Sequence, residues 1–352
     1  MHTAAHCGLK KPISQFKTEH FCYDSVVNLL VTGGAGFIGS HFVLRHCAQF
    51  PKDRLVVLDK LTYAADRHFL DPVKDQITFI EGDIADQTIV FNLLQEKKID
   101  TIVDFAAETH VDNSISDPGP FLQTNVLGVQ NLINACRARP QIRFLHISTD
   151  EVYGDVGEGG RPRTVGDPLV PSSPYAASKA AGDLLIIAAM RTYGIHAAIT
   201  RCTNNYGPHQ AAEKFIPTII RSALADKPIP VYGNGRNKRD WLFVTDHCDA
   251  VEKILSTDWA FADAAIHSGH LFNISADDER ENLAVVRAIL EVLGKPESLI
   301  SFVPDRPGHD WRYALDSSAT RALGWAPKVP FEKGLEETVQ WYRSHVRSSS
   351  ST

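Results

Sequence analysis

The sequence predicts an α/β protein built on a doubly wound parallel sheet, with a smaller α/β substrate domain toward its C-terminus. Three observations support this fold class. Short apolar runs alternate with helical patterns from about residue 26, and a glycine-rich turn joins the first run to the first helical pattern. This alternation ends after Asn205. Alternating strands and helices imply parallel strands joined by right-handed crossovers.

Composition places the chain in the globular class. It has 352 residues, of which 43% are hydrophobic and 22% charged, as in ordinary soluble domains. The net charge of −6 gives no sign of the basic surface that nucleic-acid binding requires. No apolar run reaches the roughly 18 residues of a membrane span. Six cysteines without CxxC spacing argue against a zinc site or a disulfide framework. We therefore expect reduced thiols, no metal, no membrane partner and a cytoplasmic protein.

Residues 1–25 are expected to be an extension, poorly ordered or loosely packed on the surface. The segment lacks the apolar core of about 7–15 residues that a secretory signal needs. Its basic residues and few acids leave a transit peptide as the alternative, although Arg is absent.

The first strand, predicted at 26–31, runs into TGGAGFIGSH and then an apolar-periodic helix. Gly33 permits a tight turn, Gly36 lets a pyrophosphate approach the helix N-terminus, and Gly39 allows the helix and strand to pack closely. A glycine motif alone is also compatible with a simple turn. The flanking strand and helix favour a Rossmann dinucleotide site.

The second strand, LVVLD, ends in Asp59, twenty residues after Gly39. An acid at this position accepts hydrogen bonds from the adenosine ribose and would repel a 2′-phosphate, which favours NAD over NADP. Lys60 supports the opposite choice, because a base there would pair with that phosphate. We expect NAD.

Further strands are predicted at TFIEGD, TIVDFAA, RFLHIST and HAAITRC. Asp83 and Ile84 follow the third strand, where an acid can reach the adenine amine. Ala106 and Ala107 follow the fourth, at the carboxyl edge where ligands bind in such sheets.

Tyr175 and Lys179 form a YxxxK pair in SPYAASKAAG. Residues at i and i+4 share a helix face, so the ammonium, together with the nicotinamide charge, is expected to stabilise a phenolate. The tyrosine would then take a proton from a sugar hydroxyl while a hydride leaves for NAD. A chance pairing on an amphipathic helix is the alternative.

Thr149, Asp150 and Glu151 end the fifth apolar run. Two adjacent carboxyls raise the pKa of one of them, which suits an acid beside a base. The two carboxyls therefore predict a second general acid/base pair, in addition to Tyr175 and Lys179. Capping of the next helix is the competing interpretation.

In order along about 27–345, the chain contains TGGAGFIGSH, DKLTYA, FAAETHVDNSI, TNVLGV, STDEVYG, PYAASKAAGD, RCTNNYGPHQ, RDWLFVTDH and RPGHDWRYALD. These motifs resemble the nucleotide-sugar branch of the extended short-chain dehydrogenases and, within it, the dTDP-glucose 4,6-dehydratases. Related 4-epimerases resemble SSATVYG where this chain has STDEVYG, and UDP-glucuronate decarboxylases resemble STSEVYG. Unlike these epimerase and decarboxylase motifs, the motif of this chain contains both acids, and water elimination requires both.

The resemblance implies a mechanism and a set of site residues. After C4 is oxidised, Glu151 would remove the C5 proton, Asp150 would protonate the departing C6 hydroxyl, and the hydride would return to C6, so that tightly bound NAD is regenerated. Thr149 would hydrogen-bond the C4 oxygen. The implied cofactor site comprises Gly33, Gly36, Phe37, Ile38, Gly39, Asp59, Lys60, Leu61, Thr62, Asp83, Ile84, Ala106, Ala107, Thr124, Tyr175, Lys179 and Asn205. The implied substrate site comprises Thr109, Thr149, Asn204, Lys214, Phe215, Pro230, Tyr232, Arg239, Asn273, Arg306 and His309.

The expected domains interleave in sequence. Residues 26–203 with about 231–271 would bind NAD, because DHCDAVEKIL is predicted to be a helix that returns to the sheet. Residues of about 204–230 with 272–345 would bind the nucleotide sugar. The segment RPGHD favours thymidine, whereas Trp311 stands where the family commonly has Arg and leaves the base less certain.

The helices FLQTNVLGVQNLINACRA and the one that bears Tyr175 have wide apolar faces. In the family such helices pair as a four-helix bundle, so we expect a homodimer, with packing inside one subunit as the alternative. Other functions stay open at this point: a UDP-glucose 4,6-dehydratase, an epimerase or decarboxylase, and a non-catalytic NAD-binding regulator.

Overall fold

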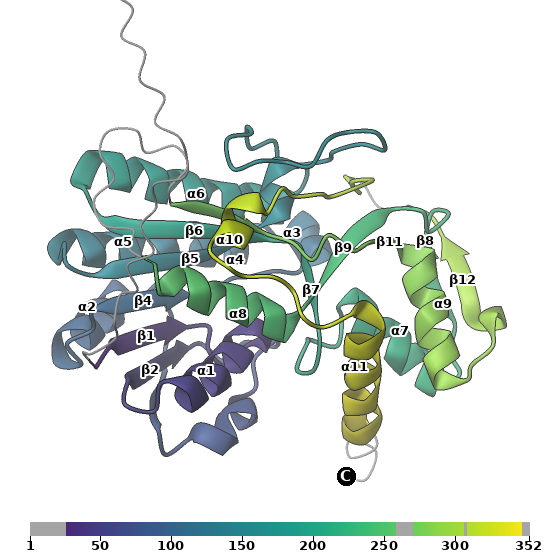
Figure 1. Ribbon diagram of the computed structural model, residues 1–352, viewed down its shortest axis with the longest axis horizontal. Helices are drawn as coiled ribbons and strands as arrows, with labels where there is room; N and C mark the ends of the chain where they lie inside the picture. Colours follow the sequence, from purple (N-terminus) through teal and green to yellow (C-terminus); the bar gives the residue numbers. More distant parts are fainter. Residues whose placement is uncertain (1–25, 258–269, 306–307, 347–352) are drawn as a thin grey trace, which may run out of the picture.

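The computed structural model describes residues 26–257, 270–305 and 308–346. The expected N-terminal extension and Arg306 lie outside them. Figure 1 shows a large lobe around a central sheet and a smaller lobe at the right of the view. No helix in the described ranges is long and apolar enough to cross a membrane.

The central sheet confirms the predicted fold class. It has seven strands in the order β10-β6-β5-β4-β1-β2-β3, and all neighbouring pairs are parallel. The strands are β1 (Asn28–Thr32), β2 (Arg54–Asp59), β3 (Ile77–Glu81), β4 (Thr101–Asp104), β5 (Arg143–Thr149), β6 (His196–Cys202) and β10 (Leu271–Ile274).

Helices cover both faces of this sheet because alternate strand residues point to opposite sides. Leu29 and Val31 of β1 belong to one core cluster and Leu30 to the other. The first face carries α1 (Phe37–Gln49), η2 (Arg67–Val73) and α8 (Val244–Leu255). The second carries α2 (Gln87–Glu96), α5 (Val129–Ala138) and α6 (Pro174–Tyr193). Doubly wound packing therefore follows from strands that are apolar on both sides.

The helix predicted in FLQTNVLGVQNLINACRA is interrupted. It comprises α4 (Gly119–Leu122), a π-helical segment, η3 (Gln123–Gly128), and α5. Asn125 in the π segment is buried, and its side chain bonds both backbone groups of Glu108 and the hydroxyl of Ser178. Periodicity does not register the extra residue of a π turn, which often marks a functional site.

The smaller lobe has its own core. Its strands form a three-stranded sheet, β11-β9-β7, and a two-stranded sheet, β12-β8. Its elements are β7 (Asn204–Tyr206), α7 (Phe215–Leu224), β8 (Ile229–Tyr232), β9 (Lys238–Phe243), β11 (Glu279–Glu281), α9 (Asn282–Leu293), β12 (Ile300–Val303) and α11 (Phe331–Val346). The remaining short helices are α3 (Val111–Ser116), η4 (Asp150–Tyr153), η5 (Glu297–Leu299) and α10 (Ser318–Ala322).

These placements move two of the expected domain boundaries. Residues 231–243 were assigned to the NAD-binding domain, but β8 and β9 pair with strands of the smaller lobe. In contrast, β10 was assigned largely to the substrate domain and instead pairs with β6 at the edge of the central sheet. The apolar runs alone did not indicate which sheet each strand joins.

Candidate active site

The glycine-rich turn fits a ligand that approaches the backbone. Gly33 has a φ of +65°, and a Cβ there would lie 2.6 Å from the backbone nitrogen of Ala106. A Cβ on Gly39 would lie 2.2 Å from the carbonyl oxygen of Gly33. Gly36 is the N-cap of α1 and provides no side-chain cap. The N-terminus of α1 therefore leaves backbone N–H groups for an anion.

Asp59 lies buried at the end of β2. Its carboxylate accepts hydrogen bonds from the backbone N–H groups of Ala35, at 2.9 Å, and Leu61, at 2.8 Å. Burial raises the pKa of Asp59, against the opposing effect of these two bonds. Lys60, the residue that argued for NADP, forms an ion pair with Asp83 at 2.7 Å. Its charge is therefore matched within the protein.

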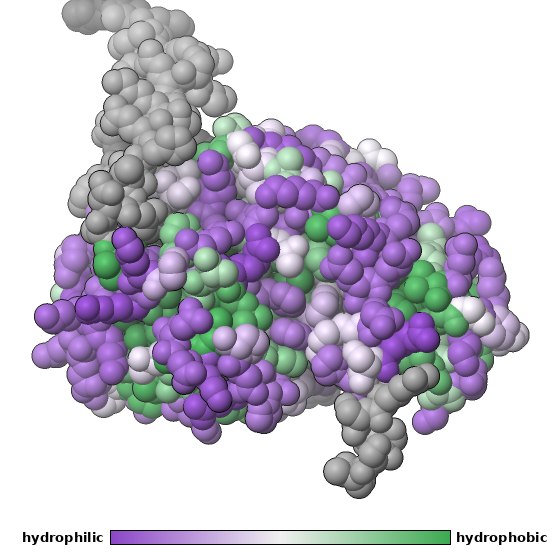
Figure 2. All heavy atoms as spheres, turned by 60° about the horizontal axis from the view of Figure 1, so that its bottom comes forward, coloured by the Kyte–Doolittle hydropathy of each residue, from purple (hydrophilic) through white to green (hydrophobic). Residues whose placement is uncertain are grey.

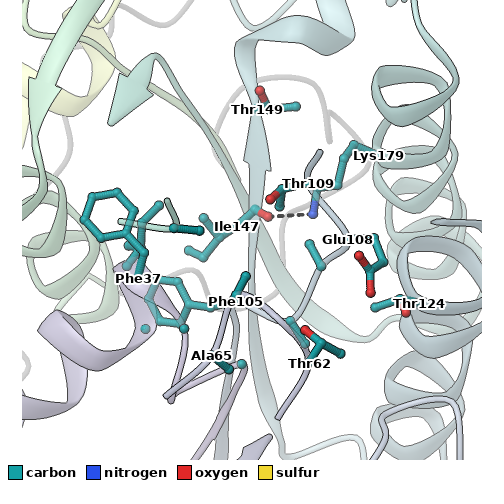
Figure 3. Close-up of a pocket in the computed structure, with 18 of the residues that line it drawn as sticks. Phe37, Thr62, Ala65, Phe105, Glu108, Thr109, Thr124, Ile147, Thr149 and Lys179 are labelled. Carbon is teal, nitrogen blue, oxygen red and sulfur yellow. Dashed lines mark hydrogen bonds between the residues drawn. The ribbon is translucent and has the colours of Figure 1, made fainter. Parts of the chain in front are cut away.

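One cavity joins this turn to the predicted catalytic residues, along the carboxyl edge of the sheet (Figure 3). The predicted cofactor residues that line it are Gly33, Gly36, Phe37, Ile38, Gly39, Asp59, Lys60, Thr62, Asp83, Ile84, Ala106, Ala107, Thr124, Tyr175, Lys179 and Asn205. Leu61 contributes through its bond to Asp59. Thr109, Thr149, Asn204 and Lys214 line the cavity among the predicted substrate residues, and the Nζ of Lys214 lies 2.6 Å from the carbonyl of Thr109.

The threonine and both acids meet the phenol at the end of β5. The Oγ1 of Thr149 donates to Oδ1 of Asp150 at 3.1 Å and accepts from the backbone N–H of Glu151 at 3.3 Å. The side chain of the same threonine acts against burial to lower the pKa of the Tyr175 phenol. Thr149, and neither of the two acids, is the N-cap of the short helix η4.

Asp150 has the surroundings of a proton donor. Its side chain is buried, and among the described residues its Oδ2 has no hydrogen-bond partner. Burial and the neighbouring charge of Glu151 raise the pKa of Asp150 well above its ordinary value. Such a carboxyl is protonated at a pH where a solvated one has ionised.

The phenol lies in buried and acidic surroundings. Burial, then the charge of Glu151, raises the pKa of Tyr175 well above its ordinary value, so the expected phenolate depends on the positive charges of Lys179 and of bound NAD. The ammonium of Lys179 donates instead to the carbonyl of Ile147 at 2.8 Å and contacts Nε2 of His146 at 3.2 Å. Figure 3 shows this lysine reaching across to Ile147 on the strand.

Several predicted substrate residues lie outside the cavity. Arg239 is buried, donates to the carbonyls of Lys238, Asp310 and Trp311, and lies 4.3 Å over the ring of Tyr313. Its charge lowers the pKa of Asp150, against burial. The others are Phe215, stacked on Trp241, Asn273, bonded to Tyr153, and Pro230, Tyr232 and His309 at the smaller lobe.

The cavity also includes residues that had no predicted role. Ser148 is the second-last residue of β5, Cys202 is the last of β6, and Glu108, expected only to lie at the carboxyl edge, follows β4. A polar residue that closes an apolar strand was the available signal. Two further polar residues without a predicted role, Asp104 at the end of β4 and His146 in the middle of β5, are buried near Lys179. The part of the chain that the structure describes holds no cluster of metal-ligating side chains.

Comparison with known proteins resolves the class of enzyme. A family model described as GDP-mannose 4,6 dehydratase matches residues 30–338. The chain is 48% identical over 335 residues to a dTDP-glucose 4,6-dehydratase of Xanthomonas campestris, covering 89% of this chain and 92% of that protein. It is 46% identical over 322 residues to one of Mycobacterium tuberculosis, with 91% and 94% covered.

The chain belongs to the dTDP-glucose 4,6-dehydratase family. A crystal structure of that enzyme from Streptomyces venezuelae, with NAD and TYD bound, superposes with a TM-score of 0.84 and 43% identity, covering 92% of this chain and 98% of the other. A UDP-glucose 4-epimerase of Thermus thermophilus in complex with NAD has a TM-score of 0.80 at 31% identity, with 90% and 99% covered. The fold is thus shared with epimerases.

Proposed function

We propose that this chain binds NAD and converts dTDP-glucose to dTDP-4-keto-6-deoxyglucose and water. The observation that carries the proposal is the pair Asp150 and Glu151, which lines one cavity with Tyr175 and Lys179 in a chain of the 4,6-dehydratase family. A non-catalytic NAD-binding regulator would have no use for all four groups.

The residues of the glycine turn fit NAD. Gly33 and Gly39 leave no space for a Cβ, so the turn packs tightly, and Gly36 at the N-terminus of α1 has no side chain to keep a pyrophosphate from the backbone. Asp59 is placed for the ribose hydroxyls, and the pairing of Lys60 with Asp83 leaves a 2′-phosphate without a dedicated cation. Bound NAD would take the hydride of C4 and later return it to C6.

The side chains move the protons. Tyr175 takes the proton of the C4 hydroxyl, and Thr149 hydrogen-bonds the same oxygen as it becomes a carbonyl. Glu151 then removes the proton of C5, which the C4 ketone has made acidic. Asp150 gives its proton to the C6 hydroxyl, which leaves as water. Glu151 finally returns its proton to C5, while C6 receives the hydride.

We place the nucleotide end of the substrate against the smaller lobe. Lys214 lies within the cavity and suits the diphosphate. Tyr232 and His309 meet edge to face with ring centroids 5.9 Å apart, and we assign them to the base. Arg239, Phe215 and Pro230 belong to this lobe, Asn273 lies on β10 of the central sheet, and Arg306 lies outside the described residues.

We also propose a cytoplasmic homodimer. Leu122, Leu127 and Leu184 are each more than half exposed on helical segments that contact one another, and an apolar face of this kind is normally buried in a partner. Pairing of α4–α5 and α6 from two copies would form a four-helix bundle. Cys47, Cys136, Cys202 and Cys248 are free and buried, as in proteins of a reducing compartment.

Incubation of the protein with dTDP-glucose, without added NAD, tests the function. The product should absorb near-ultraviolet light in alkali as a 4-keto sugar, and parallel assays with UDP-glucose identify the base. An isomeric sugar that lacks this absorbance would indicate an epimerase and contradict the proposal. No turnover even with added NAD would also contradict it.

A further inference from the structure

A buried chain of polar contacts lies behind the catalytic lysine. Asp104 of β4 and His146 of β5 are register partners on neighbouring strands and are fully buried. Oδ2 of Asp104 lies 2.7 Å from Nδ1 of His146, and Oδ1 accepts a 2.5 Å hydrogen bond from Thr32. The other imidazole nitrogen lies 3.2 Å from Nζ of Lys179. The proposed reaction uses neither the carboxylate nor the imidazole.

These contacts fix the tautomer of His146. Although burial raises it, the pKa of Asp104 is held below its ordinary value by the bond to His146 and the charge of Lys179. The carboxylate is therefore an acceptor, and Nδ1 of the imidazole carries the hydrogen. Nε2 then presents its lone pair to the ammonium, which also donates to the carbonyl of Ile147.

The charges around the imidazole balance when it is neutral. Asp183 of α6 lies 3.9 Å from Nε2 through Oδ1, and its Oδ2 accepts from Arg201 at 2.8 Å. Two carboxylates, Asp104 and Asp183, thus offset two cations, Lys179 and Arg201. Burial and the charge of Lys179 lower the pKa of His146. A second proton on the ring would leave an unmatched charge in a site closed to solvent.

Close packing of α6 makes this arrangement possible. A Cβ on Gly182 would lie 2.9 Å from the carbonyl oxygen of Asn125 and 3.8 Å from Nε2 of His146. The absence of a side chain lets α6 pack closely against η3, with ordinary contact to the imidazole of β5. Lys179 and Asp183, one turn apart, then both reach Nε2 of the imidazole.

We propose that Asp104 and His146 are positioning residues that hold the Lys179 ammonium against the carbonyl of Ile147 and keep it charged. The inference rests on the proposed function, in which Lys179 acts with Tyr175. Burial favours the uncharged amine, and Asp104, Asp183 and the thiol of Cys202 are the groups that oppose it. Of these, Asp104 is the one at hydrogen-bond distance from the ring that also contacts the ammonium.

The proposal sets the direction of a pH effect. The titratable groups that face the phenol of Tyr175 are Glu151, Cys202 and Asp150, and all of them raise its pKa. Loss of the Asp104 charge would, by direct electrostatics, make a phenolate easier to form. Acting through a weakened Lys179 ammonium, the same loss makes the phenolate harder to form. The two routes therefore predict shifts of opposite sign.

The first experiment measures C4 oxidation against pH, as formation of reduced nicotinamide in a single turnover of the holoenzyme with dTDP-glucose. In Asp104→Asn and His146→Leu, the apparent pKa of the acid limb, on the low-pH side of the rate profile, should rise by about one pH unit or more. His146→Gln should retain the wild-type limb, because its amide can donate to Asp104 and accept from Lys179. Thr200→Val is the control, since this buried Oγ1 has no hydrogen-bond partner among the described residues. An unchanged or downward-shifted limb in Asp104→Asn would overturn the proposal.

A second measurement needs no substrate and separates failure of this inference from failure of the proposed function. Nitrogen-15 NMR of histidine-labelled protein, with the His146 signal assigned by its loss in His146→Gln, should show the Nδ1–H tautomer from about pH 5 to 9. An Nε2–H tautomer, or titration of His146 within that range, would overturn the inference even if dTDP-glucose is dehydrated normally. If the protein shows the expected tautomer but does not act on dTDP-glucose, the proposed function is contradicted and the assigned tautomer of His146 is not.

Discussion

Asp150 and Glu151 are neighbours in sequence, yet the end of β5 gives them different surroundings. Asp150 is 3% exposed, with one oxygen bonded to Thr149, whereas Glu151 is partly exposed. Burial raises the pKa of the first carboxyl, so it can hold a proton while the second is a base. Two identical functional groups thereby acquire opposite roles.

The double variant Asp150→Asn with Glu151→Gln should separate oxidation from elimination. Tyr175, Thr149 and Lys179 are intact in it, so reduced nicotinamide should build up on the protein when substrate is added. Formation of the 6-deoxy product should fall by about 100-fold or more. Absorbance of the protein and chromatography of the sugar measure the two steps. Glu158→Gln, an exposed acid in the following loop, is the matched control, and normal product from the double variant would refute the assigned roles.

Asp150 should also make stability depend on pH. Its pKa is raised in the folded state above the unfolded value of about 3.9, so the folded protein binds more protons between these two values. Its contribution to the free energy of unfolding is present below about pH 4 and is lost as pH rises through the folded pKa. Asp150→Asn lacks this titration and should gain about 1 kcal/mol or more relative to wild type by neutral pH. Urea unfolding at several pH values measures it, and parallel curves would contradict the raised pKa.

At the scale of elements, the junction of β1 and α1 depends on residues without side chains. A Cβ on Gly39 would meet backbone that cannot move independently of the sheet, because Gly33 donates to Leu58 at the end of β2. The close contact of helix and strand is therefore what shapes the turn for a ligand.

Gly39→Ala should lose affinity for NAD by about tenfold or more and unfold about 1–3 kcal/mol more easily. Calorimetric titration with NAD after removal of bound cofactor, and thermal unfolding, measure the two effects. Gly159→Ala is the control, because no atom lies within 4 Å of a Cβ built there. If both variants bind NAD equally, the role given to Gly39 is wrong.

The sequence predicted elements better than the contacts between them. The strands at LVVLD and RFLHIST stand where expected, because continuous apolar runs closed by acids or Thr are typical of buried parallel strands. The π segment around Asn125 and the transfer of β8 and β9 to the smaller lobe were not predicted. Both depend on tertiary hydrogen bonds that no local pattern records.

The same limit explains the substrate site. Thr109 and Asn204 come after the ends of β4 and β6, Lys214 is the N-cap of α7, and all three lie in the cavity. Arg239 is predicted to contact a diphosphate, and the structure shows its guanidinium donating to the carbonyls of Lys238, Asp310 and Trp311. A lone arginine in a sequence does not indicate whether anions or carbonyl oxygens surround it.

At the scale of the whole molecule, the distribution of apolar surface predicts how copies associate. The face in Figure 2 is largely hydrophilic, with apolar patches between charged side chains. Leu184 on α6 is 56% exposed and Phe302 on β12 of the smaller lobe is 58% exposed. Because Leu184 and Phe302 are similarly exposed but lie on different lobes, substitutions at these two positions can be compared directly.

Leu184→Glu should convert the proposed dimer to a monomer, because a charge would be buried without a partner. Phe302→Glu should leave the dimer intact, since β12 lies outside the proposed bundle. Sedimentation velocity at micromolar concentration measures both. A wild-type monomer, or dissociation by the Phe302 substitution alone, would contradict the bundle interface.

The two lobes, the glycine turn and the acid pair together imply that one hydrogen migrates within the sugar while the cofactor is regenerated. The most direct test uses dTDP-glucose with deuterium at C4, and mass spectrometry with NMR to locate the label in the product. The deuterium should appear at C6 of a 4-keto-6-deoxy sugar. Deuterium retained at C4 of an isomeric hexose, or a 6-deoxy product without label, would contradict the account.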